Sequence, residues 1–414
     1  MPIPFARRTH WDLADSSTHQ ALCERRAAGL PVLDLTASNP TQAGFDYDAA
    51  ALLAPLSLPE ALIYDPDPRG MLCAREAVGR YYGDHAAVVS PEQVMLTTST
   101  SEAYSHLFRL LCDPGDEVLI GRPSYPLFDF LAQISDVRLV DFSLFYDHGW
   151  HTDLAGLRQK ITPRTRAIIL VHPNNPTGHY TAQAERQAIE ALCVEHGLAL
   201  IVDEVFLDYP LAPEDYPLAP LGDSSLSGPN IGASSSFTCG PHPALTFVLS
   251  GLSKIAGLPQ MKGAWLAAFG PEAEVRLALA RLEVIADTYL SMNAPVQHAF
   301  APWLAGRARL IDQIQVRVSH NLEELDRQID RQLPQLSMVS RLEVEAGWYA
   351  VLRIPALEPD EQVAELLLRE EGVSVYPGSF FGFSTSGWLV LSLLTQPKEW
   401  NAGIEAILHR INGL

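Results

Sequence analysis

The 414-residue sequence has few basic residues: 29 Lys and Arg stand against 49 Asp and Glu, which gives a formal net charge of −20. A surface that binds nucleic acid needs clustered Lys and Arg, so we expect no nucleic-acid partner. No apolar run approaches the length of a membrane span, and no apolar core follows Arg7 and Arg8 as it does in a secretory signal. We therefore expect a cytoplasmic protein without a membrane partner.

Cysteine is also scarce. The five cysteines are scattered, odd in number and not spaced as metal ligands, so we expect no metal site. We interpret them as the reduced, buried thiols of a cytoplasmic protein. They are Cys23, Cys73, Cys112, Cys193 and Cys239.

The chain is longer than one ordinary hydrophobic core requires, which predicts more than one domain. Between residues 64 and 259, short apolar runs alternate with helical patterns, and one such pattern, Ala182 to His196, ends before Gly197. This alternation predicts a mostly parallel sheet with helices on both faces. The predicted strands cover residues 94–96, 117–120, 137–140, 167–171, 198–202 and 246–249.

The pattern changes near residue 300. A long amphipathic helix is predicted over residues 310–329 and is followed by mixed strands and helices. The Ser/Gly-rich stretch 224–236 is predicted to be a loop. We expect an α/β fold with a three-layer α/β/α large domain at residues 45–300. A smaller α+β domain is expected to combine residues 1–44 with residues 301–414.

One lysine stands among small and apolar residues directly after the strand predicted at residues 246–249. Lys254 lies in the stretch Ser250–Leu258, where removal from water would lower the pKa of its amine and make it a nucleophile that forms Schiff bases. Alternatively, Lys254 caps the strand end with its charge in solvent.

Ligands of open α/β sheets bind beyond the carboxyl ends of the strands, so the residues after the other runs matter. The hydroxyl-rich turn Thr97–Ser101 opens a helix and suits either a phosphate or an ordinary N-cap. Tyr125 lies between two prolines, where its ring could stack on a planar ligand or pack at the surface. Asn175 lies in a turn and could hydrogen-bond a ligand oxygen. Asp203 ends an apolar run and needs a cation, either a protonated pyridine nitrogen or an arginine.

These residues together are those that a pyridoxal phosphate site requires, and the sequence closely resembles the fold-type-I, class I and II pyridoxal-phosphate-dependent aminotransferases over nearly its whole length. The resemblance implies that Ser99, Thr100 and Ser101 form the phosphate loop and that Tyr125 stacks on the cofactor ring. It implies further roles for three residues: Asn175 bonds the phenolic oxygen, Asp203 keeps the pyridine nitrogen protonated, and Lys254, preceded by Ser253, forms the internal aldimine.

The same resemblance extends to the dimer and the substrate. Tyr64, with Gly70 and Arg75 after it, looks like the element that reaches the cofactor phosphate of the neighbouring subunit in a homodimer. Asn39 resembles the segment that covers the substrate. The implied activity is transfer of an amino group from an amino acid donor to a 2-oxo acid or aldehyde, with Lys254 carrying the proton as base and acid.

Four positions depart from the family pattern. Phe206 replaces a usual tyrosine near the phenolic oxygen, Gly251 replaces a phosphate-binding serine, and Lys262 replaces a phosphate-binding arginine. Val390 replaces the arginine that holds the substrate carboxylate. Arg353, on an apolar strand, is a candidate for that missing role, although it could equally be a paired surface residue; Arg69 and Arg122 are further candidates.

These departures leave two alternatives open. The first is other pyridoxal phosphate chemistry on the same fold, that of a lyase, decarboxylase or oxidase. The second is a binding or regulatory protein with an inactive site that holds a nucleotide through Thr97–Ser101.

Overall fold

The computed structural model describes residues 3–211, 236–332 and 338–413. The loop predicted at residues 224–236 therefore lies, except for Ser236, outside the described residues. Within the described residues the largest sheet has eight strands in the order β2-β9-β8-β7-β6-β3-β4-β5. Its strands are β2 (Val94–Thr97), β3 (Glu117–Arg122), β4 (Arg138–Tyr146), β5 (Trp150–Thr152), β6 (Thr165–Val171), β7 (Ala199–Asp203), β8 (Thr246–Gly251) and β9 (Ala264–Phe269).

Each of the six predicted apolar runs forms a strand of this sheet, so that prediction is confirmed. Strands β4, β3, β6, β7 and β8 pair in parallel, whereas β9 is antiparallel to both β8 and β2. The sequence analysis did not predict β5 or β9. The alanine-rich sequence of β9 lacks the β-branched residues that indicate a strand.

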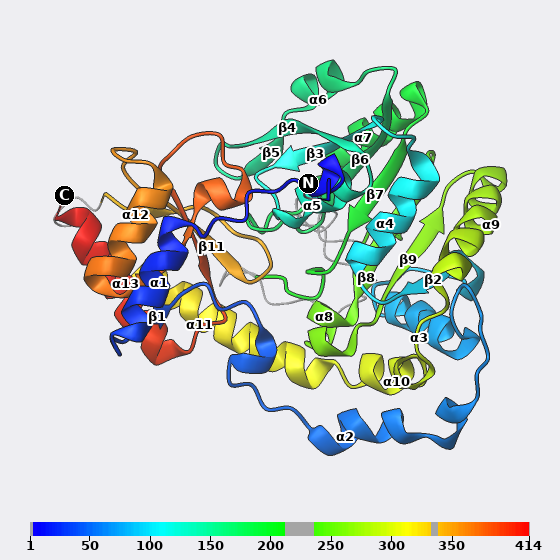
Figure 1. Ribbon diagram of the computed structural model, residues 1–414, viewed down its shortest axis with the longest axis horizontal. Coiled ribbons are helices and arrows are strands. Elements are labelled where there is room, and N and C mark those ends of the chain that lie inside the picture. Colours follow the sequence, from blue (N-terminus) through cyan, green and yellow to red (C-terminus); the bar gives the residue numbers. More distant parts are fainter. Residues whose placement is uncertain (1–2, 212–235, 333–337, 414) are drawn as a thin grey trace.

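Helices cover both faces of the sheet, as expected (Figure 1). Alternate strand residues pack into two separate hydrophobic clusters, which explains why the strands are apolar throughout. One face packs against α3 (Leu72–Gly83), α6 (Leu154–Lys160), α7 (Gln183–His196), α8 (Leu252–Ile255) and α10 (Ala294–Ala305). The other packs against α4 (Thr100–Leu111), α5 (Leu127–Ile134) and α9 (Glu272–Tyr289). Helix α7 ends at Gly197, which adopts the left-handed conformation of a helix C-cap.

A second, smaller unit combines both ends of the chain (Figure 1). Near its N-terminal end, β1 pairs in parallel with β12, and β10-β11-β14-β13 form a four-stranded sheet. The amphipathic helix predicted at residues 310–329 is confirmed as α11. The elements of this unit are α1 (Ser17–Ala27), β1 (Leu33–Asp34), α11 (Ala308–Gln332), β10 (Ser340–Arg341), β11 (Tyr349–Arg353), α12 (Asp360–Leu366), β12 (Val373–Ser374), β13 (Tyr376–Pro377), β14 (Trp388–Ser392) and α13 (Pro397–Asn412).

Two details concern the expected domain limits. Residue 300 falls inside α10, whose Trp303 and Leu304 belong to the same hydrophobic cluster as the large sheet. We therefore propose that the boundary lies at Gly306, between α10 and α11. The first residues of the chain also leave the small unit, because Arg8 pairs with Asp136 at 2.5 Å, just beyond the end of α5.

The cysteine prediction is correct in one respect and wrong in another. All five thiols are free. Only Cys193 is buried, however, whereas Cys23 and Cys73 are exposed, because each lies on the outer side of a surface helix. None of the helices in the described residues is both long enough and apolar enough to cross a membrane.

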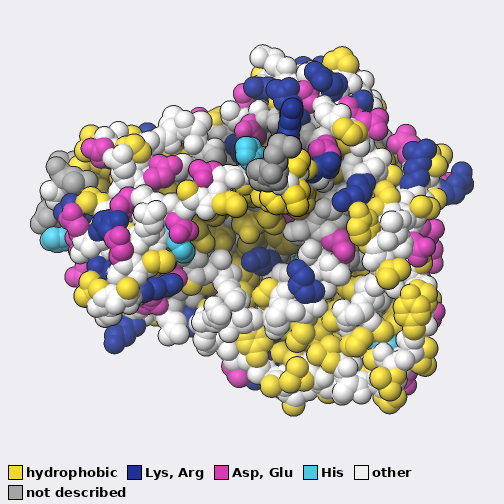
Figure 2. Space-filling model, in the orientation of Figure 1, with side chains coloured by type: hydrophobic (Ala, Val, Ile, Leu, Met, Phe, Trp, Pro, Cys, Tyr) yellow, Lys and Arg dark blue, Asp and Glu magenta, His cyan; other side chains and the backbone are white. Residues whose placement is uncertain are grey.

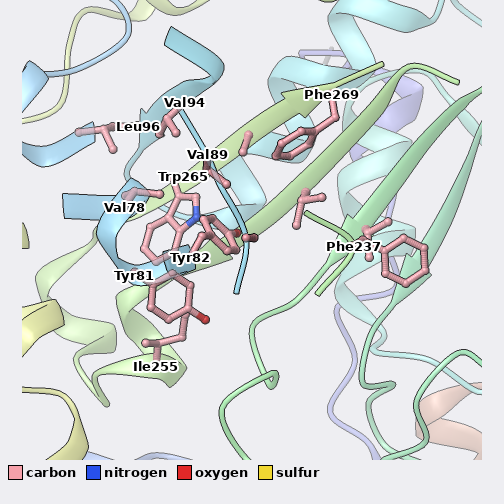
Figure 3. Close-up of a cluster of buried hydrophobic side chains, with 14 of the residues drawn as sticks. Val78, Tyr81, Tyr82, Val89, Val94, Leu96, Phe237, Ile255, Trp265 and Phe269 are labelled. Carbon is pink, nitrogen blue, oxygen red and sulfur yellow. The ribbon is translucent and has the colours of Figure 1, made fainter. Parts of the chain in front are cut away.

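Trp265 of β9 lies at the centre of the larger hydrophobic cluster (Figure 3). Its indole is fully buried, its ring centroid lies 5.5 Å from that of Tyr81, and its Nε1 donates a hydrogen bond to the Tyr82 hydroxyl at 3.1 Å. This contact attaches α3 to β9, and through β9 to the strand that carries α8.

We predict that Trp265→Ala lowers the free energy of unfolding by about 3–5 kcal/mol, because it leaves a large cavity and an unpaired Tyr82 hydroxyl. Val88→Ala, at a side chain that is 95% exposed, is the control and should change it by less than about 0.5 kcal/mol. Urea denaturation followed by circular dichroism measures both. Equal midpoints for the two variants would contradict the prediction.

Candidate active site

Strands β2, β3, β6, β7 and β8 all point the same way, so their carboxyl ends meet at one edge of the sheet. Each of the five predicted segments lies at one of these ends or a few residues after it: Thr97–Ser101, Tyr125, Asn175, Asp203 and Lys254. Figure 2 shows a hollow between the two units that is lined by hydrophobic side chains and contains basic ones.

Lys254 lies in the short helix α8, three residues after β8 ends at Gly251. Its Nζ lies 4.7 Å from the ring centroid of Trp348 and 5.5 Å from that of Phe206. Burial lowers the pKa of Lys254 to about 8, and the Asp203 carboxylate acts in the opposite direction. This environment agrees with the lowered pKa expected from the sequence and not with a lysine that holds its charge in solvent.

Asp203, the last residue of β7, is 7% exposed. Its carboxylate accepts hydrogen bonds from the Tyr104 hydroxyl at 3.3 Å and from the Val205 N–H at 3.2 Å. Burial raises the pKa of Asp203 to about 6, while these two hydrogen bonds and Lys254 lower it. Among the described residues no arginine pairs with Asp203, so the alternative of a structural ion pair is not found.

The turn after β2 is the N-terminus of α4. The Ser99 oxygen accepts the Glu102 N–H at 3.1 Å as the N-cap, which leaves the hydroxyl proton of Ser99 able to donate elsewhere. The N–H groups of Thr100 and Ser101 lie in the first turn, where a helix has no internal acceptor for them. The turn thus serves as the predicted N-cap and also presents donors suited to a phosphate.

Asn175 and Tyr125 differ in exposure. Asn175 is buried, and its Oδ1 has no hydrogen-bond partner within the described structure. A buried amide oxygen without a partner is costly, so a ligand donor at this position would remove the penalty. Tyr125 is 42% exposed, so a face of its ring is available for stacking.

The residues around Lys254 explain one of the departures from the family pattern. A Cβ at Gly251 would lie 2.8 Å from the Ala264 Cβ, so a serine does not fit there without movement of β9. Ser253 is partly buried in α8 beside Lys254. Lys262 is exposed and adopts the left-handed conformation. Their predicted phosphate contacts remain predictions.

Three further candidates lie apart from the amine. Tyr64 is 76% exposed, as a residue that reaches another subunit must be. Asn39 is exposed and its Oδ1 accepts the Thr41 N–H at 3.1 Å, so its side chain caps a local turn. Arg75 is buried and donates to the Gly70 carbonyl at 2.8 Å, which gives it a structural role in the loop before α3.

Arg353 lies at the wrong end of its strand for the role predicted from the sequence. It is exposed, and its guanidinium carbon lies 5.8 Å from the ring centroid of Trp388. Tyr349, at the opposite end of β11, is the residue that approaches Phe206, with ring centroids 6.5 Å apart. Four residues of strand span about 13 Å. The structure therefore does not bring Arg353 to Lys254.

The other two candidate arginines are also engaged elsewhere. Arg69 pairs with Glu283. Arg122 pairs with Asp129 at 2.6 Å and with Asp141 at 3.0 Å.

The sequence analysis missed three residues that contact Asp203 or Lys254. Tyr104 bonds Asp203, Trp348 covers the Lys254 amine, and the Tyr209 hydroxyl donates to the Lys254 carbonyl at 2.6 Å. Tyr104 lies one helical turn after the predicted phosphate donors, on the same helix α4. This spacing could have indicated that its side chain lies near the site. Trp348 and Tyr209 gave no such signal, because only folding brings them to Lys254.

Taken together, these residues fit pyridoxal phosphate. The fit rests on the unpartnered Asn175 oxygen, on a buried carboxylate that lacks an arginine, and on the donors of the α4 N-terminus. Each of these features suits a different part of the cofactor: the phenolic oxygen, the pyridine nitrogen and the phosphate.

Comparison with known proteins identifies the family. The model of the class I and II aminotransferases matches residues 32–407, so the chain belongs to this family and the resemblance noted in the sequence is confirmed. Pyridoxal phosphate is the cofactor of this family.

Individual relatives agree with this assignment. The chain is 30% identical to a glutamate-pyruvate aminotransferase, AlaA of Escherichia coli K12, over 282 residues, which are 67% of this chain and 64% of that protein. The match thus spans less than two thirds of that relative's length. An alanine aminotransferase of Mycobacterium tuberculosis H37Rv is 29% identical over 94% of this chain and 87% of its own. The structure of an Escherichia coli aminotransferase, 24% identical, superposes with a TM-score of 0.81 over 100% of this chain and 99% of that one.

We predict that the Lys254 amine titrates near pH 8. Only the unprotonated amine attacks an aldehyde, so the yield of borohydride-fixed pyridoxal phosphate on Lys254 should rise with pH and reach half its maximum near the pKa of about 8. In Asp203→Asn the midpoint should fall further, because the carboxylate that favours the protonated amine is lost. Peptide mapping after labelling between about pH 6 and pH 10 measures both.

The exposed Lys398 is the internal control of the peptide mapping. A Lys254 profile that coincides with that of Lys398 would contradict the prediction.

Proposed function

We propose that this protein is a pyridoxal-phosphate-dependent aminotransferase that moves an amino group from an amino acid to a 2-oxo acid or aldehyde. The observation that carries the proposal is the partly buried Lys254 amine, whose pKa is lowered and which interacts electrostatically with the buried Asp203 carboxylate. The family assignment supports the same reaction, and the relatives named above are called aminotransferases. They favour transfer over the lyase, decarboxylase or oxidase alternative.

The proposed roles follow from the positions of the side chains. Pyridoxal phosphate, when bound, supplies an aldehyde for the substrate amine and a ring that withdraws electrons. Lys254 Nζ would bind that aldehyde and, once displaced by the substrate amine, would move the proton from the substrate Cα to the former aldehyde carbon. Asp203 would hold a proton on the ring nitrogen, Asn175 would bond the phenolic oxygen and Tyr125 would stack on the ring.

The remaining cofactor contacts involve the phosphate. Ser99, Thr100 and Ser101 would bind it at the N-terminus of α4, where free N–H groups and the helix dipole favour an anion. Ser253 and Lys262 are proposed to assist from the segment around α8. Partial burial of Lys254 beside Trp348 lowers the pKa of the amine to about 8 and so keeps part of it unprotonated near neutral pH.

We also propose a homodimer with shared active sites. Several large apolar side chains are exposed between residue 53 and the first residue of α3, and in the second half of α9 and just after it: Leu53, Leu58, Leu62, Ile63, Tyr64, Leu72, Val284, Tyr289 and Leu290. Arg69 pairs with Glu283 and so joins the two segments. Figure 2 shows hydrophobic side chains gathered at the lower right, in the region of α3 and α10 in Figure 1. An exposed apolar surface of this kind supports the proposed interface, and Tyr64 is one of its residues.

A cytoplasmic location is part of the proposal. It is supported by the five free thiols, because the cysteines of secreted proteins usually form disulfides.

We predict that Lys254→Ala lowers the rate of amino transfer at least about 1,000-fold, because it removes both the amine that binds the aldehyde and the group that moves the proton. In the wild type, the cofactor absorbance should change on addition of an amino donor and return with a 2-oxo acid; Lys398→Ala is the control and should behave as the wild type. Release of ammonia and an oxo acid without any acceptor would instead support the lyase alternative.

We predict that Ile63→Asp weakens the dimer at least about 10-fold, because it buries an unpaired charge in an apolar interface. Leu357→Asp, at a side chain that is 70% exposed in the small unit, is the control and should leave the dimer intact. Sedimentation velocity over a dilution series measures both. A monomeric wild type would contradict the proposed dimer.

A further inference from the structure

Three hydroxyl groups converge on the small-unit side of the site, and neither the proposed mechanism nor the sequence analysis uses them. They belong to Ser38, Tyr349 and Tyr376 and are called the hydroxyl cluster below. Ser38 interacts with the side chains of both tyrosines. Tyr349 is 7% exposed, and Ser38 and Tyr376 are partly buried.

The strand β14 places the members of the hydroxyl cluster together. Tyr349 of β11 lies opposite Ser392, and Tyr376 of β13 lies opposite Val390, so both tyrosines project from the same face of the sheet. The Ser392 N–H donates to the Leu35 carbonyl at 2.7 Å, and its hydroxyl donates to the Ala37 carbonyl at 2.5 Å. These two hydrogen bonds hold the chain before Ser38 against β14.

Aromatic rings connect the hydroxyl cluster to the Lys254 amine. The Phe206 ring centroid lies 5.5 Å from Lys254 Nζ and 6.5 Å from the Tyr349 ring centroid. Phe381 continues the row, with its ring centroid 6.0 Å from that of Tyr349 and 5.6 Å from that of Tyr376. A substrate whose amine is at Lys254 thus meets an apolar row of rings that ends in hydroxyl groups.

The charges around the hydroxyl cluster do not favour an anion. Burial raises the pKa of Tyr349 and of Tyr376, so both remain protonated donors. The largest charged influences resolved on the pKa of the two tyrosines are the Asp34 carboxylate on Tyr376, the Tyr376 phenol on Tyr349 and the Tyr125 phenol on both, and none of them is a cation. Val390 is fully buried between Val351 and Tyr376. A carboxylate here would lose its hydration without gaining a positive partner, whereas an uncharged group needs only hydrogen bonds.

We propose that Ser38, Tyr349 and Tyr376 form a substrate subsite for an uncharged polar group, so that the preferred amino donor carries a carboxamide, ester or hydroxyl there instead of a free carboxylate. This inference rests on the proposed aminotransferase function and specifies the substrate class of the same site.

The test uses the holoenzyme and two matched pairs of donors: alanine with alaninamide, and phenylalanine with phenylalaninamide. The second-order rate constant of each half-reaction is read from the change in cofactor absorbance. In the wild type we expect the amide to react at least as fast as the acid in one or both pairs. Tyr376→Phe and Ser38→Ala should each slow the amide about 10-fold, the effect of one neutral hydrogen bond.

Two further variants control the comparison. Tyr146→Phe removes a hydroxyl that accepts the Glu343 N–H at 3.2 Å, outside the hydroxyl cluster, and should leave both rate constants unchanged. Val390→Arg should shift the preference towards the acid by more than about 10-fold, because it adds a cation beside Tyr376.

The outcomes separate the two proposals. A wild type that prefers both acids by more than about 100-fold, and is insensitive to Tyr376→Phe and Ser38→Ala, overturns the subsite and leaves transamination standing. A holoenzyme whose absorbance responds to none of the four donors, nor to any other amino acid, overturns the proposed function and the subsite with it.

Discussion

Burial of two opposite charges at one edge of the sheet is the constraint on which the site depends. It lowers the pKa of Lys254 to about 8 and raises that of Asp203 to about 6, so burial outweighs the attraction between them in both groups. The Asp203 carboxylate is held ionised chiefly by the Val205 N–H and the Tyr104 hydroxyl. Asp203 loses a nearby positive charge when the Lys254 amine is deprotonated. A cationic ring nitrogen beside Asp203 would replace that charge.

The fold gives the two sides of this site different chemistry. The large sheet contributes charged and polar groups, because five parallel strand ends present their loops to one edge. The small unit contributes aromatic rings and uncharged hydroxyls, among them Trp348 and Tyr376. Since the small unit is built from both ends of the chain, residues near position 38 and near position 390 meet beside the same amine.

The sequence predicted the sheet side of the site well and the other side poorly. Asp203, Asn175 and Lys254 could be located because each lies at the end of an apolar strand or within four residues after it, and the carboxyl ends of parallel strands meet. Trp348 and the hydroxyl cluster depend on contacts between distant segments, which no local pattern records. Arg353 was misjudged for the same reason, because its position on an apolar strand did not reveal which end of that strand faces the amine. Strand β9 was missed because its alanines resemble a helix more than a strand.

Two of the departures from the family pattern share a physical cause. Gly251 is required by the close approach of Ala264 on β9, and the Phe206 ring packs edge-on against Trp348 with centroids 5.3 Å apart. At each of these two positions the family usually has a hydroxyl group, of a serine or a tyrosine, and this chain has a tightly packed residue without one. Among the described residues, burial is therefore the largest influence on the pKa of Lys254, and the only other influence resolved is the charge of Asp203. Val390 extends the same trend to the small unit, where apolar packing takes the place of a cation. The proton affinity of the amine is thus set by packing more than by hydrogen bonds.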